Sequence, residues 1–124
     1  MPNKEESRII NVRKLVSNAK AILTNQIGFP LGIRKMVRIQ AWIRPSLSEI
    51  DLGVFRECDL AFGGCPIGSE RLLWEKNALK IQDEIIEKVL ANYKGRIIDK
   101  CFEIIELLDE KSEKCIGSGS VNLL

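Results

Sequence analysis

The 124-residue sequence contains no histidine. Histidine is the commonest general base and metal ligand, so its absence excludes Ser-His and Cys-His nucleophile pairs and the Glu-x-x-His element of di-iron bundles. Neither a G-x-x-x-x-G-K-[ST] phosphate loop nor a G-x-G-x-x-G motif occurs. Nothing in the pattern singles out two of the seventeen acidic residues as an acid and base pair. We therefore expect a protein without catalytic residues or a cofactor, and not an enzyme.

The cysteine pattern of a metal site is also absent. The four cysteines are separated by 7, 36 and 14 residues: Cys58, Cys65, Cys101 and Cys115. No C-x-x-C pair is present, so we expect no bound metal. Cys101 falls in an apolar helical row and is expected to be a small buried hydrophobe.

Long apolar runs are absent as well. None approaches the roughly 18 residues of a membrane span, and the first seven residues are polar rather than an apolar signal segment. We expect no membrane association and a cytoplasmic location. The length suits one domain, which we place at residues 1–116, with the Gly-Ser-rich residues 117–124 as a flexible tail.

Apolar residues recur at spacings of three and four along the chain, and no segment alternates with the period of a β-strand. The sequence therefore predicts an all-α fold, a compact bundle of four to five helices. A first helix is expected over residues 5–24. A second is expected from Pro30 to about Arg44, where Pro45 stops it. The inward row of this second helix is predicted to be Ile33, Met36, Val37 and Ala41.

Later boundaries follow from capping and breaking residues. Residues 46–48 are expected to cap a short helix that carries Ile50, Val54 and Phe55. Residues 61–68 hold three glycines and a proline, which predicts a loop. Ser69 is then the predicted N-cap of a long C-terminal helix, with Trp74 in its buried row. Because Gly95 interrupts this pattern, we expect one long helix or a helix pair that is kinked or broken there.

The net charge of +2 conceals an uneven distribution. Residues 1–47 contain nine basic and two acidic side chains, whereas residues 48–124 contain ten basic and fifteen acidic ones. The first part therefore carries +7 and the second −5. The chain is a charge dipole in sequence, which suggests that it acts through charged surfaces.

Five carboxylates in the last helix are spaced four, three, four and three residues apart. At about 100° per residue they occupy one arc of roughly 80°, opposite the apolar row. A solvated surface accounts for such a row, but like charges repel at these spacings, so a basic partner is the alternative. The candidate partner-binding residues are Asp99, Glu103, Glu106, Glu110 and Glu113.

A second candidate surface lies on the second helix, opposite Ile33 and Val37. It comprises Arg34, Lys35, Arg38 and Trp42. The simplest expectation is that Trp42 packs beneath a neighbouring helix. Alternatively, a tryptophan among cations is typical of a binding hot spot or of a platform for nucleic-acid bases.

Several short motifs extend over about residues 15–105. They are Ala19-Lys20-Ala21-Ile22-Leu23, the turn from Gly28 to Gly32 before Arg34-Lys35-Met36, Phe55, Asp59, Pro66-x-Gly68, Arg71-x-x-Trp74, Ala78-Leu79 and Asp83. Together they resemble a family of small, all-helical bacterial proteins that has no assigned enzymatic activity. Members occur beside polymorphic and contact-dependent growth inhibition toxins. The resemblance implies an immunity protein that neutralises such a toxin by binding it.

Function is therefore expected to reside in binding. The leading hypothesis is an immunity protein that blocks a cognate cytosol-acting toxin, a nuclease whose basic cleft accepts the acidic row. The immunity protein itself is not expected to bind nucleic acid. The alternative is a small helical nucleic-acid-binding regulator that uses the basic face of the second helix. A third hypothesis is a homo-oligomer in which the acidic row of one copy meets the basic helix of another.

Overall fold

The computed structural model describes residues 4–43 and 50–109. In these ranges the protein is all-helical, with four α-helices, one short 3-10 helix and no strand. The elements in chain order are α1 (Lys4–Leu23), α2 (Phe29–Ile43), α3 (Gly53–Ala61), the 3-10 helix η2 (Ser69–Leu73) and α4 (Lys76–Leu108). The predicted all-α fold with one long C-terminal helix is confirmed.

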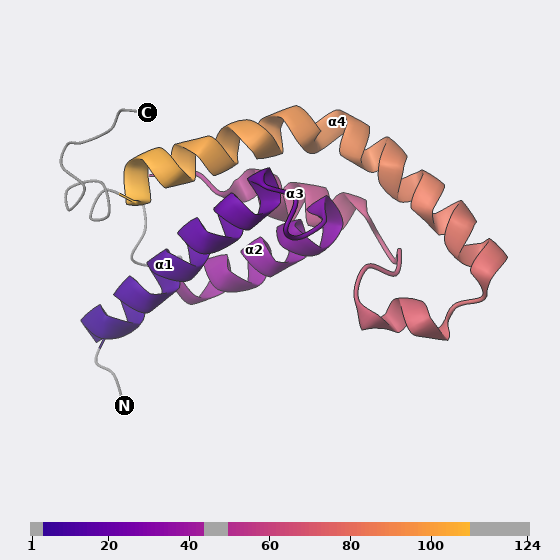
Figure 1. The fold of residues 1–124 in the computed structure, drawn as a ribbon, viewed down its shortest axis with the longest axis horizontal. Coiled ribbons are helices and arrows are strands. Elements are labelled where there is room, and N and C mark those ends of the chain that lie inside the picture. The colour runs from indigo at the N-terminus through magenta and orange to yellow at the C-terminus, as the bar shows by residue number, and fades with distance from the viewer. Residues whose placement is uncertain (1–3, 44–49, 110–124) are drawn as a thin grey trace.

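The helices form a small bundle that is covered by the long helix α4. α1 and α2 lie side by side, and α4 curves over them (Figure 1). α1 packs against α2 and α4, and α3 also packs against both of these helices. None of the helices described is long and apolar enough to cross a membrane.

The core lies where these helices meet. Its fully buried members come from all four α-helices: Leu15, Ala19, Ile22, Ile33, Met36, Phe55, Cys58, Ile97, Cys101 and Ile104. The predicted burial of Cys101 is confirmed. On α2 the prediction is wrong for Ala41, which is exposed, while Ile39 is buried. The buried side of α2 follows the three-residue spacing from Ile33 through Met36 to Ile39, which turns Ala41 outward.

A close approach of α1 to α2 depends on Gly32. A Cβ atom at this position would lie 2.6 Å from Cγ1 of Ile22, a distance that requires a shift. The buried Asn18 side chain donates from Nδ2 to the Gly32 carbonyl at 2.9 Å. Between the two helices, Asn25 adopts a left-handed conformation with φ of 62°, which asparagine tolerates well.

The start of α3 differs from the expectation. The helix begins at Gly53, and the Asp51 carboxylate accepts the Gly53 N–H at 2.9 Å. The predicted cap at residues 46–48 lies outside the described residues. Ile50 is buried ahead of the helix, and residues 62–68 form the predicted loop.

The prediction that Ser69 caps the long helix is wrong. Ser69 starts η2, and α4 begins at Lys76 with Glu75 as its N-cap, whose carboxylate accepts the Ala78 N–H at 3.1 Å. Trp74 lies between the two in extended conformation and is partly exposed, so the expectation of a core tryptophan is also wrong. Two contacts stabilise this turn: the Glu70 carboxylate accepts the Ile67 N–H, and Arg71 contacts Asp83 of α4.

α4 continues through Gly95 without a break. It comprises 33 residues, and its buried members Leu90 and Ile97 lie on one face on both sides of Gly95. The glycine penalty of about 1 kcal/mol is small beside the burial of these side chains. A helix pair broken at Gly95 is therefore excluded, and α4 is a single curved helix (Figure 1).

Candidate functional site

Three members of the acidic row lie on the side of α4 opposite its buried residues, and two of them, Asp99 and Glu103, line a cavity. Asp99 and Glu106 are exposed and Glu103 is partly exposed, while Ile97, Cys101 and Ile104 face the core. These three carboxylates therefore share one accessible surface. Glu110 and Glu113, the other two members of the predicted row, lie outside the described residues.

Two large apolar side chains flank these carboxylates and were not predicted from the sequence. Phe102 is 53% exposed and Leu107 is 45% exposed. At about 100° per residue they fall on opposite sides of the row. We call this set the acidic face of α4: Asp99, Phe102, Glu103, Glu106 and Leu107. The sequence feature that could have indicated them is their position, because both lie outside the apolar row of their helix.

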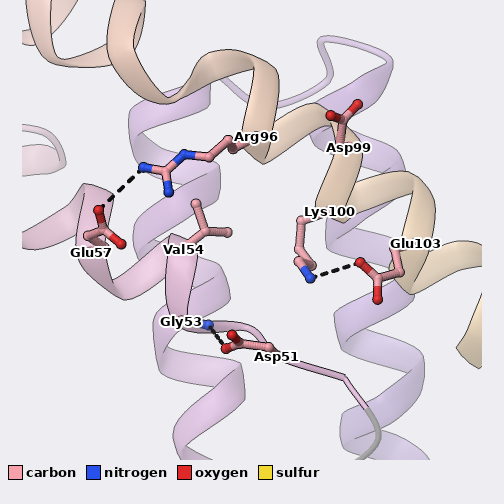
Figure 2. Close-up of a pocket in the computed structure, with 8 residues that line it drawn as sticks. All are labelled: Asp51, Gly53, Val54, Glu57, Arg96, Asp99, Lys100 and Glu103. Carbon is pink, nitrogen blue, oxygen red and sulfur yellow. Dashed lines mark hydrogen bonds and ion pairs between the residues drawn. The ribbon is translucent and has the colours of Figure 1, made fainter.

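A cavity of about 420 Å³ adjoins the acidic face, between α3 and α4 (Figure 2). Lys100 and Arg96 lie among its carboxylates. Nζ of Lys100 is 2.8 Å from Oε1 of Glu103, and Nη2 of Arg96 is 3.3 Å from Oε2 of Glu57. Figure 2 shows Asp99 at the α4 side of the cavity, apart from both pairs. The negative charge is therefore partly compensated here, more than the row alone suggested.

Glu57 also receives a hydrogen bond from the Tyr93 hydroxyl at 3.0 Å. This bond, together with desolvation, raises the pKa of Tyr93 above its usual value. Tyr93 therefore stays protonated and acts as a donor that links α4 to α3. Polar contacts of Glu57 therefore link α3 to α4 beside the cavity.

The predicted basic set on α2 divides into two parts. Arg34 contacts two acidic side chains, with Nε 3.2 Å from Oδ1 of Asp59 and Nη1 3.4 Å from Oε2 of Glu70. Arg34 thus joins α2 to α3 and η2. Lys35 and Arg38 are exposed, and Trp42 is 75% exposed. The expectation that Trp42 packs beneath a neighbouring helix is wrong.

Arg71 and Asp83, which belong to the short motifs noted in the sequence, link η2 to α4. Arg71 forms a two-pronged contact with Asp83, with Nη1 to Oδ1 at 2.8 Å and Nη2 to Oδ2 at 3.0 Å. Hydrogen bonding by Arg71 lowers the pKa of the Asp83 carboxyl. Arg71 also donates to the Pro66 carbonyl at 3.1 Å. These contacts give both residues a structural role.

The η2 region exposes further apolar side chains. Leu72 and Leu73 are each 88% exposed, and Trp74, Ile81 and Ile85 are exposed in part. We call these five residues the apolar tip. It was not predicted from the sequence, because a helix starting at Ser69 would place Trp74, Ile81 and Ile85 in its inward row.

Three of the four cysteines lie in the described part of the chain. Cys58, Cys65 and Cys101 are buried and free, and no group of three or more candidate metal-binding side chains occurs within residues 4–43 and 50–109. Burial raises the pKa of the Cys58 thiol to about 11 and that of Cys101 to about 12. Both are therefore inert protonated thiols at neutral pH.

No protein-family model matches this chain, and no match was found among the curated proteins or the solved structures. Function must therefore be inferred from the surfaces of the molecule. Three of them are candidates for binding: the acidic face of α4, the exposed Lys35, Arg38 and Trp42 of α2, and the apolar tip.

Proposed function

We propose that this chain is an immunity protein that binds and neutralises a cognate cytosol-acting bacterial toxin, a nuclease of a contact-dependent growth inhibition system. The observation that carries the proposal is the composition of the acidic face of α4. Exposed carboxylates lie there beside Phe102 and Leu107. A merely solvated helix face does not require large exposed apolar side chains, whereas protein interfaces use them as anchors.

The basic cleft of a nuclease and the acidic face of α4 would be complementary in charge. A nuclease holds the phosphate backbone in a basic cleft. Asp99, Glu103 and Glu106 would attract this cleft and accelerate association, while Phe102 and Leu107 would supply contact area that excludes water. Inhibition then requires no chemistry from the immunity protein. The resemblance to small helical proteins beside growth-inhibition toxins supports the same function.

The test begins with the reading frame immediately upstream, which the proposal expects to encode a large secreted protein with a toxic C-terminal domain. That domain should co-purify with this chain, and co-expression should protect cells from it. Glu103→Lys with Glu106→Lys should abolish capture and protection while circular dichroism shows an unchanged fold. Phe102→Ala should weaken binding by at least about tenfold if Phe102 is an anchor.

A matched control is available on the same helix. Glu84 and Glu87 are exposed and have the same three-residue spacing, so Glu84→Lys with Glu87→Lys makes the same change of charge outside the acidic face. This variant should bind and protect. Absence of a toxic domain upstream, or equal binding by the two double variants, would refute the proposal.

The exposure of Trp42 favours a second candidate function, a nucleic-acid-binding regulator. Trp42 lies on the same face of α2 as Lys35 and Arg38, so a base could stack on the indole while the cations contact phosphates. Binding of a labelled single-stranded RNA should then fall steeply with salt and should be lost in Trp42→Ala. Absence of such binding at low salt would exclude this function.

A further inference from the structure

A groove between α1 and α2 lies apart from the acidic face of α4 and the apolar tip. Its volume is about 840 Å³. Aliphatic side chains line it from both helices and from the turn between them, including Ile10, Ile27 and Ile39. A groove of this size and lining can accept apolar side chains from a partner.

The same groove carries positive charge. Arg13 and Lys14 of α1 and Lys35 of α2 line it, and all three side chains are exposed. No acidic side chain is among the described residues that line it. Within the described part of the chain these three cations form no ion pair. Their charge is therefore available to a carboxylate from outside.

Asn18 supplies an independent sign of a missing partner. Its side chain lines the groove and is 3% exposed. The bond from Nδ2 to the Gly32 carbonyl fixes the orientation of the amide, and Oδ1 is then a buried acceptor with no donor among the described residues. Buried polar atoms are nearly always hydrogen-bonded, so an N–H or O–H donor is expected at this point.

We propose that the groove between α1 and α2 binds an acidic amphipathic segment of a partner protein. The carboxylates of that segment pair with Arg13, Lys14 and Lys35, its apolar side chains contact Ile27 and Ile39, and one of its N–H or O–H groups reaches Oδ1 of Asn18. Helix-in-groove recognition combines apolar anchors and a charged rim in this way.

Nucleic acid fits the groove less well. Proteins that bind single strands combine a basic track with aromatic side chains on which bases stack. No aromatic residue is among those described residues that line this groove, and Trp42 is not one of them. Aliphatic side chains and a buried amide oxygen suit a polypeptide instead. The proposal is independent of the toxin-binding function above, which uses a face of α4.

The experiment selects ligands without assuming their sequence. A random peptide library of about 16 residues, enough for four helical turns, is displayed and selected against the full chain. The proposal expects enrichment of acidic, amphipathic peptides. Affinities are then measured by fluorescence anisotropy with the enriched peptides as probes, and should weaken as salt rises.

Two charge-reversal variants of equal size locate the binding site. Arg13→Glu with Lys14→Glu should weaken binding of the enriched peptides by at least about tenfold, because the charges facing their carboxylates change sign. Lys76→Glu with Lys80→Glu makes the same charge change on exposed positions of α4 and should have no effect. Thermal melts check that both variants fold. Enrichment of basic or uncharged peptides, or equal binding by the two variants, overturns the proposal.

A second copy of the chain or a nucleic acid in the groove would each give a different result. If light scattering shows a dimer of the wild-type chain that the Arg13 and Lys14 reversal dissociates, the occupant is a second copy. If a labelled single-stranded RNA binds and both this reversal and Trp42→Ala abolish its binding, the groove belongs to a nucleic-acid site. Either result overturns the proposal of a partner-protein segment.

Discussion

Arg34 shows how a residue that resembles a binding cation acquires a structural role. Its guanidinium lies between Asp59 and Glu70, and its side chain is only 24% exposed. The sequence places Arg34 correctly on the outer face of α2 beside Lys35 and Arg38. It does not indicate which of these cations meets a carboxylate 25 residues later, because that depends on how α3 packs.

Replacing Arg34 should therefore cost stability rather than binding. Arg34→Ala leaves the half-buried Asp59 carboxylate without its partner, and we expect the free energy of unfolding to fall by about 1–3 kcal/mol. Arg38→Ala, one turn further along α2 and exposed, should change it by less than about 0.5 kcal/mol. Urea unfolding followed by circular dichroism measures both. Equal effects would show that the ion pairs of Arg34 contribute nothing.

The buried cysteines lead to a prediction about thiol reactivity. In a Cys115→Ser background, Cys58, Cys65 and Cys101 should react with a thiol reagent at pH 8 far more slowly in the native state than in denaturant, because burial limits access to all three and raises the pKa of Cys58 and Cys101. Rapid stoichiometric labelling of the native protein would contradict the burial of these side chains.

The thiols of Cys58 and Cys101 make the stability of the protein depend on pH in the alkaline range. Their pKa values in the folded protein, about 11 and about 12, exceed the ordinary value of 9.0, so above pH 9 the unfolded chain releases these protons first. Their contribution to stability is complete below pH 9 and is lost as pH rises through 11 to 12. Cys58→Ala with Cys101→Ala should reduce the slope of the urea midpoint against pH in this range, whatever its effect at pH 7.

Among the elements, glycines in helices provide a sharp contrast. Gly32 is buried, and its missing side chain lets α1 approach α2, whereas Gly95 is exposed and a Cβ atom added there would meet nothing within 4 Å. Both positions lie within α-helices, Gly32 in the first turn of α2 and Gly95 in the middle of α4, and they differ sharply in packing. Their substitutions separate helix propensity from helix packing.

Gly32→Ala should destabilise the protein, because the added methyl group displaces Ile22 at a cost of about 1–3 kcal/mol, partly offset by better helix propensity. Gly95→Ala should stabilise it by about 0.5–1 kcal/mol. Chemical denaturation of both variants provides the measurement. A destabilised Gly95→Ala would mean that the curvature of α4 depends on this glycine.

The helices themselves were predictable because their cause is local. Spacings of three and four identify α1, α2 and most of α4, and Pro66 with its neighbouring glycines marks the loop before η2. The division between η2 and α4 was not predictable, since Ser69 and Glu70 look like the first turn of a helix. It depends instead on two side-chain contacts: Arg71 reaches Asp83 of α4, and the Glu70 carboxylate accepts the N–H of Ile67, three residues earlier, at 3.1 Å.

At the scale of the whole molecule, the candidate surfaces were predictable only in outline. The charge asymmetry along the chain indicated a basic second helix, and α2 carries three basic and no acidic side chains, whereas α4 is balanced, with six of each. The Lys100 pair with Glu103 lies within α4 at a spacing of three residues, but the exposure of Phe102 and Trp42 and the groove beside Asn18 follow from how helices meet. No periodicity within one helix determines such contacts.

The distribution of buried residues also divides α4 into two parts. Its five buried members are Ile86, Leu90, Ile97, Cys101 and Ile104. None precedes Ile86, and the first ten residues of the helix project beyond the bundle toward η2 (Figure 1). The Arg71 contact with Asp83 fastens this projecting part to η2. Local opening free energies should therefore differ between the two parts of one continuous helix.

Amide hydrogen exchange should reveal this division. Residues 76–85 should exchange much faster than residues 86–104, because they can open without exposing a buried core side chain. Arg71→Ala should accelerate exchange in residues 76–85 and leave residues 86–104 unchanged, since it removes the contact that holds the projecting part. Uniform protection along α4, or equal acceleration of both parts in Arg71→Ala, would mean that the helix opens as one unit. If the division holds, the part of α4 that carries the acidic face is the rigid one, so that face meets a partner without prior ordering of the helix.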